Sequence, residues 1–93
     1  MYKIPLFDLN FDSREKEAVN NTLDSKWIST GPNCDKFEKL FCDRFETKFS
    51  LTTSSCTASL HMSLLALGIK KDDEVLVPSL TFAATANVIK YIG

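Results

Sequence analysis

The order of hydrophobic patterns in the second half of the chain constrains its fold more than any other feature. Residues 49–53 form a short β-prone run, and residues 74–77 form a second, β-branched run that ends at Pro78. Apolar residues with helical spacing follow the first run as far as Gly68 and follow the second run from residue 81 onward. A strand-helix-strand unit of this length predicts an α/β fold, with a parallel sheet, right-handed crossovers and flanking helices.

Two further helices are predicted in the first half of the chain. The segment Asp12–Glu15 has the form of a capping box, and apolar residues then recur every four positions, which predicts a helix over about residues 13–26. A turn over residues 29–32 interrupts this pattern, and a second apolar stripe predicts a helix from about Pro32 to Phe45. The phenylalanines of this stripe, which we expect to pack in the core, are Phe37, Phe41 and Phe45.

Composition and charge narrow the class of protein. The chain has 93 residues, of which 44% are hydrophobic, as in a globular protein, but a domain this short buries only about 60–65% of its extended-state surface and is marginal alone. Its 11 basic and 12 acidic residues are spread along the sequence, so no nucleic-acid partner is expected. No apolar run suggests a signal peptide or a membrane span, and the cytoplasm is the expected location.

The three cysteines are expected to be free thiols, buried in most or all cases. Their odd number and the lack of CxxC spacing argue against a disulfide framework and against a zinc site. If Cys34 and Cys42 share one helix, eight residues separate them by about 12 Å, which is too far for a disulfide.

The step from the first predicted strand into its helix, Leu51–His61, is a candidate anion site. The first N–H groups of a helix have no intrahelical partner, and the helix dipole adds positive charge, so a phosphate placed there meets ready donors. Hydroxyls are added by Ser54, Ser55 and Thr57, for which ordinary helix capping is the alternative interpretation. A second small-hydroxyl segment, Pro78–Phe82, follows the second strand, and ligands of open α/β sheets bind beyond the carboxyl ends of strands.

Four segments, which together span essentially the whole chain, carry a resemblance to a known family: Ile4–Leu6, Lys26–Pro32, Ser54–His61 and Asp73–Asn87. The chain resembles the N-terminal part of the DegT/DnrJ/EryC1/StrS sugar aminotransferases, which use pyridoxal 5′-phosphate (PLP) on nucleotide-linked keto-sugars. The resemblance implies a PLP-dependent transferase of the aspartate aminotransferase type (fold type I), with residues 1–93 as the N-terminal portion of its PLP-binding large domain.

The same resemblance implies where the cofactor binds. The family usually has Ser-Ser-Gly-Thr-Ala where this chain has Ser54–Ala58, and backbone amides and the threonine hold the phosphate there, which places it at Cys56 and Thr57. Because the family has glycine or alanine at the position of Cys56, we expect this residue to contribute through its N–H alone. An aromatic residue of the family's Pro-Ser-x-Thr-aromatic segment stacks on the cofactor ring, which points to Phe82, although a core position is the alternative.

The resemblance also places the turn that contains Trp27, Ser29 and Thr30 near the substrate pocket. A tryptophan on a helical stripe before a Gly-Pro turn has an equally adequate structural interpretation. His61 follows Thr57 by one helical turn and could approach the phosphate, but a packed or partly solvated histidine is the simpler interpretation.

The implied activity is transfer of an amino group from an amino acid, expected to be glutamate, to a nucleotide-linked keto-deoxysugar in the synthesis of surface polysaccharide or lipopolysaccharide. Family members are homodimers, and their Schiff-base lysine lies beyond the position of Gly93. We therefore expect this chain to be an N-terminal fragment without a catalytic residue of its own. The alternatives are a family sugar dehydratase, in which that lysine is replaced, and a truncated remnant that regulates or binds a partner.

Overall fold

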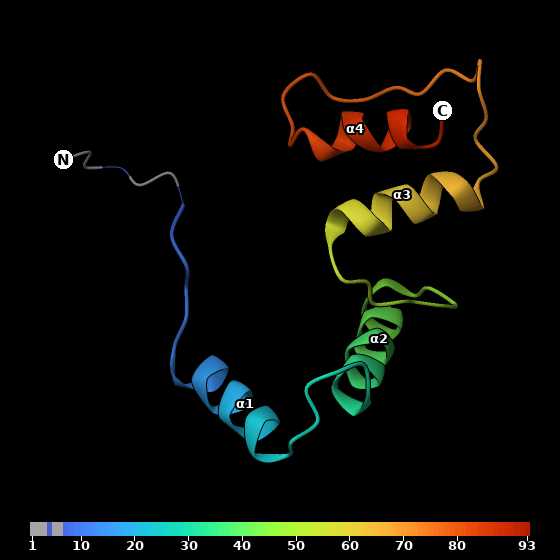
Figure 1. Cartoon of the computed structure of the whole chain (residues 1–93). Coiled ribbons are helices and arrows are strands. Elements are labelled where there is room, and N and C mark those ends of the chain that lie inside the picture. Colours follow the sequence, from blue (N-terminus) through green and yellow to red (C-terminus); the bar gives the residue numbers. More distant parts are fainter. Residues whose placement is uncertain (1–3, 5–6) are drawn as a thin grey trace.

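Four helices make up the regular structure of this computed structural model, which describes residue 4 and residues 7–93. In chain order they are α1 (Ser13–Asp24), α2 (Pro32–Phe45), α3 (Cys56–Ala66) and α4 (Ala84–Tyr91) (Figure 1). All four lie where helices were predicted from the sequence, and the bounds of α2 agree with the prediction at both ends. None of these described helices is both long and apolar enough to cross a membrane.

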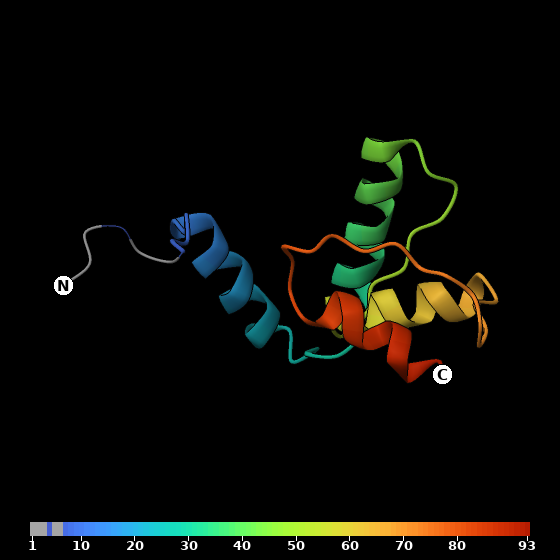
Figure 2. The same cartoon turned by 90° about the horizontal axis from the view of Figure 1, so that it is seen from above.

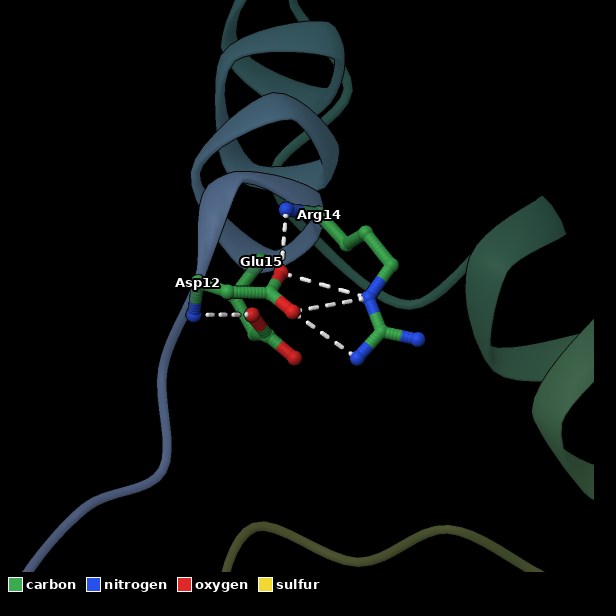
Figure 3. A network of polar contacts seen from close by, with 3 residues as sticks. All are labelled: Asp12, Arg14 and Glu15. Atoms are coloured by element: carbon green, nitrogen blue, oxygen red, sulfur yellow. Dashed lines mark hydrogen bonds and ion pairs between the residues drawn. The ribbon is translucent and has the colours of Figure 1, made fainter.

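The start of α1 confirms the predicted capping box (Figure 3). One carboxylate oxygen of Asp12 accepts a hydrogen bond from the backbone N–H of Arg14 at 2.7 Å, and the Glu15 carboxylate accepts one from the N–H of Asp12 at 2.8 Å. The Arg14 guanidinium also pairs with Asp12 at 2.9 Å. These contacts hold the pKa of Asp12 below its ordinary value, with the Arg14 side chain as the largest cause.

The turn between α1 and α2 is organised around Trp27. Its indole N–H donates to the carbonyl oxygen of Thr30 at 2.9 Å, and the ring lies so close to Gly31 that a Cβ there would overlap it. The backbone of Gly31 is extended, so the constraint on this glycine is steric contact with the indole. A hydrogen bond of 3.1 Å from the Asn33 side chain to the Thr22 hydroxyl ties the two helices together across the turn.

Helices α3 and α4 form the one packed helix pair of the described chain. Val88 of α4 is 2% exposed and is the only described residue that is fully buried. The rings of His61 and Tyr91 meet edge to face, with centroids 5.8 Å apart. Both views show that α3 and α4 run in the same direction and that a long connection, residues 67–83, joins them (Figures 1 and 2). Their N-terminal ends therefore lie at the same end of the pair.

The predicted parallel sheet is absent from residue 4 and residues 7–93. Residues 49–53 and 74–77 form no strand, and Leu76 is 99% exposed. A strand exists only through a hydrogen-bonded neighbour, and parallel strands are stable in larger sheets that helices cover on both faces. Two isolated segments supply neither the further strands nor the second covering layer.

The predicted core is also absent from the part of the chain that the structure describes. Phe37, Phe41 and Phe45 do form a row on α2, with ring centroids 6.3 and 4.4 Å apart, but all three are exposed. The radius of gyration is 17.7 Å, against about 12 Å expected of a compact domain of this length. Without a sheet for α2 to pack on, its aromatic stripe has no covering surface.

Acidification is expected to unwind the first turn of α1. Because the pKa of Asp12 is lowered in the folded state, its stabilising contribution is present above the ordinary aspartate pKa and is lost as pH falls through the lowered value. NMR Cα chemical shifts of residues 13–18, followed against pH, should show helicity falling over this range. In the variant Asp12→Asn, which keeps a capping oxygen that does not titrate, the loss should be smaller. Identical profiles in the two proteins would refute the role of Asp12.

The substitution Gly31→Ala is expected to displace the Trp27 indole, because the added methyl group overlaps the ring. The hydrogen bond to Thr30 should break, and a bond of about 1 kcal/mol corresponds to roughly fivefold faster exchange of the indole N–H. Trp27 is the only tryptophan of the chain, so its NMR signal and fluorescence report on this turn without interference. Ser29→Ala, which adds no atoms beside the ring, serves as the control. An unchanged exchange rate in Gly31→Ala would contradict the contact.

Candidate functional site

The start of α3 presents unpaired backbone donors. Ser55 is the N-cap, and its hydroxyl oxygen accepts a hydrogen bond from the N–H of Ala58 at 3.1 Å. The N–H of Ser59 donates to the carbonyl oxygen of Ser55 at 3.0 Å, which begins the intrahelical bonds. The N–H groups of Cys56 and Thr57 precede that first bond and have no carbonyl one turn earlier to donate to. They therefore face the open end of the helix, where an anion finds donors and the positive end of the dipole.

The capping alternative is confirmed for Ser55, which is the N-cap of α3, and is wrong for Thr57. Thr57 is the second residue inside α3 and is half-buried. Among the hydrogen bonds of the described residues, none uses the Thr57 hydroxyl. This hydroxyl and the two N–H groups are donors that suit the acceptor oxygens of a phosphate. The positive end of the helix dipole also favours the negative charge of a phosphate.

A cluster of hydroxyl groups holds the entry into α3 in place. The Thr53 hydroxyl donates to the carbonyl oxygen of Ser55 at 3.0 Å and also contacts the hydroxyl of Ser59. These bonds fold the residues before the helix back onto its first turn, so that the direction in which the free N–H groups point is defined.

Glu38 of α2 anchors the same segment from outside, a contact that sequence reasoning missed. Its Oε1 atom accepts two hydrogen bonds from Thr52, one from the backbone N–H and one from the hydroxyl, both 2.7 Å long. These bonds hold the pKa of Glu38 below its ordinary value, with the N–H of Thr52 as the largest cause. In the sequence, Glu38 is one of several charged residues on the polar face of a helix, and nothing there indicates a partner fourteen positions away.

Phe82 is 81% exposed, so the alternative interpretation of Phe82 as a core residue is wrong in this structure. It lies in the segment that leads into α4, where its carbonyl oxygen accepts a hydrogen bond from the N–H of Thr85 at 3.0 Å. Because α3 and α4 run in the same direction, this segment enters the helix pair at the end where α3 begins (Figures 1 and 2). The two small-hydroxyl segments of the sequence thus lead into the same end of one helix pair.

The turn with the candidate substrate residues lies apart from the start of α3. A hollow of about 920 Å³ lies between the end of α1 and the start of α2, and both Trp27 and Ser29 line it. Thr30 instead accepts the hydrogen bond from the Trp27 indole. All the residues that line this hollow lie within residues 18–36, and none of them belongs to α3. The hollow therefore does not bring these residues together with Thr57.

The remaining candidates have structural roles or are exposed. His61 is half-buried against Tyr91, which confirms its interpretation as a packed residue. All three cysteines are free thiols, as predicted, but Cys34 and Cys42 are only half-buried on α2 and Cys56 is exposed, so the prediction that most of them are buried is wrong.

Comparison with known proteins identifies the family. The sequence model of the DegT/DnrJ/EryC1/StrS aminotransferase family matches residues 10–93. The GDP-perosamine synthase of Escherichia coli O157:H7 is 46% identical over 94 residues, which cover 100% of this chain and 26% of that protein. An uncharacterized protein of Methanocaldococcus jannaschii is 48% identical over 86 residues, covering 92% of this chain and 22% of that protein. The chain thus spans about a quarter of the length of the curated relatives it matches.

These matches confirm the resemblance inferred from the four segments, of which Ile4–Leu6 precedes the matched range and lies largely outside the described residues. The match over residues 10–93 includes the turn at Trp27, the start of α3 and the segment at Phe82. The chain therefore belongs to the DegT/DnrJ/EryC1/StrS aminotransferase family.

Proposed function

We propose that residues 1–93 are the N-terminal portion of the PLP-binding large domain of a longer sugar aminotransferase. Family membership and the share of the relatives that the chain spans support this assignment. The arrangement of α3 and α4 supports it too, because helices that follow successive parallel strands run in the same direction. In the longer protein, residues 49–53 and 74–77 would pair with further strands of one parallel sheet.

The start of α3 is the observation that carries the proposal. The N–H groups of Cys56 and Thr57 and the Thr57 hydroxyl would hold the cofactor phosphate, and the exposed ring of Phe82 would stack on the pyridine ring. When bound, PLP supplies an electron sink for moving an amino group. The contribution of this chain is to bind the phosphate and to orient the ring. The Schiff-base lysine would come from the remainder of the protein.

The substrate proposal draws on the relative that is named for a GDP-linked amino sugar. We propose a nucleotide-linked keto-deoxysugar as the acceptor and an amino acid, glutamate, as the donor, for the synthesis of surface polysaccharide or lipopolysaccharide. Trp27, Ser29 and Thr30 would approach this substrate in the complete homodimer, where a second subunit and the rest of the domain add to the site.

The direct test is to read the gene beyond the codon for Gly93 and to purify the complete product with PLP. We expect a cofactor absorbance band that bleaches on addition of glutamate and returns on addition of a nucleotide-linked keto-sugar. A cofactor band in a protein with another residue at the Schiff-base position would indicate the dehydratase. A complete product that takes up no PLP would refute the proposal and favour a non-catalytic remnant.

The substitution Thr57→Val in the complete protein is expected to weaken PLP binding. It keeps the shape of the side chain and removes one hydrogen bond to a charged phosphate, worth about 1.5–3 kcal/mol, which corresponds to roughly 10- to 150-fold in the dissociation constant. The constant is measured by titrating the apoprotein with PLP and following absorbance. Thr47→Val, in the exposed loop after α2, is the matched control. Equal affinities in the two variants would remove Thr57 from the phosphate site.

The substitution Phe82→Ala in the complete protein is expected to loosen the cofactor ring and to shift the absorbance band. Stacking contributes about 0.5–1.5 kcal/mol beyond buried area, so PLP affinity should fall by about two- to tenfold or more. Leu80→Ala removes an apolar side chain that is also exposed in the same segment and is the control. An unaltered spectrum and affinity in Phe82→Ala would show that the ring does not stack on the cofactor.

A further inference from the structure

We propose that Glu38 is a positioning residue for the cofactor phosphate: by clamping Thr52, it sets the path of the chain into α3 and hence the direction of the free N–H groups of Cys56 and Thr57. This inference rests on the function proposed above, because it assigns a new residue to the same site. Glu38 itself need not touch the cofactor.

The geometry of the clamp is that of a strong contact. One carboxylate oxygen of Glu38 accepts both the N–H and the hydroxyl of Thr52 at 2.7 Å, and hydrogen bonds to an ionised acceptor are shorter and stronger than neutral ones. Both partners are half-buried, which reduces competition from water. The contact joins two parts of the chain separated by fourteen positions, so no local turn enforces it.

The clamp continues directly into the phosphate site. Thr52 is followed by Thr53, whose hydroxyl donates to the carbonyl oxygen of Ser55 and contacts Ser59. Ser55 is the N-cap of α3. Along the chain, the Glu38–Thr52 contact is therefore followed by the contacts of Thr53 and then by the Ser55 cap. The cap defines where the helix begins.

The two bonds explain why an acceptor is required at position 38. A backbone N–H and a hydroxyl are both donors, so the residue that joins them must supply an acceptor, and an ionised oxygen satisfies two donors at once. Glutamine keeps a neutral acceptor of the same length, whereas alanine removes the acceptor altogether. Comparing Glu38→Gln with Glu38→Ala therefore separates the effect of the negative charge from the effect of the hydrogen-bond acceptor.

The test compares PLP binding and thermal stability in the complete protein. We expect Glu38→Ala to raise the PLP dissociation constant by roughly tenfold at a temperature where the apoprotein is fully folded, and Glu38→Gln to recover part of that loss. Thr52→Val, which keeps the N–H and removes the hydroxyl, should have an intermediate effect. The double variant Glu38→Ala/Thr52→Val should be no weaker than Glu38→Ala. Glu17→Ala, which removes an exposed carboxylate of α1, is the control.

A purely structural role predicts a different result. Glu38→Ala would then lower the melting temperature of the apoprotein but leave the PLP dissociation constant at the wild-type value, and this outcome would overturn the inference alone. If Glu38→Ala does not fold, Glu38→Gln and Thr52→Val decide, since the first keeps a neutral acceptor and the second keeps the backbone N–H, and unchanged affinity in both would overturn the inference. Failure of the wild-type protein to bind PLP would instead refute the proposed function.

Discussion

Burial of apolar surface is the condition on which the packing of helices and the pairing of strands depend, and the described chain meets it at only one place. Where α3 and α4 pack together, Val88 is removed from water and the rings of His61 and Tyr91 meet. Elsewhere, large apolar side chains such as Leu76 and the phenylalanines of α2 remain exposed. A helix survives this exposure because its backbone hydrogen bonds are internal, whereas a strand does not, because its bonds belong to a neighbour.

The same distinction explains why a candidate site is formed although residue 4 and residues 7–93 contain no sheet. The donors at the start of α3 arise from the helix end itself, from the Ser55 cap and from the hydroxyl cluster around Thr53, all within eight residues. Glu38 adds one long-range anchor to this local arrangement. A site for a whole cofactor needs more than this, because the ring, the substrate and the Schiff-base lysine involve parts of the protein that meet only through the complete domain.

The sequence predicted the helices well because their signals are local. The capping box at Asp12, the proline at the start of α2 and Gly68, with its positive φ of 72° after α3, each act within one helical turn. The prediction of strands at residues 49–53 and 74–77 was not met, since β-branched runs indicate only a preference that pairing must realise. The Glu38 contact was not predictable for a related reason. Charge on a helix face is usually solvated, and only the folded path of the chain brings Thr52 within reach.

The sequence by itself determined the positions of the four helices, the cap at the start of α1 and the family to which the chain belongs, because spacing, capping chemistry and motif order are properties of neighbouring residues. Tertiary structure alone decided that Glu38 binds Thr52, that Phe82 is exposed, and that α3 and α4 share a common end. These features depend on which surfaces find a partner, and that depends on packing across the chain.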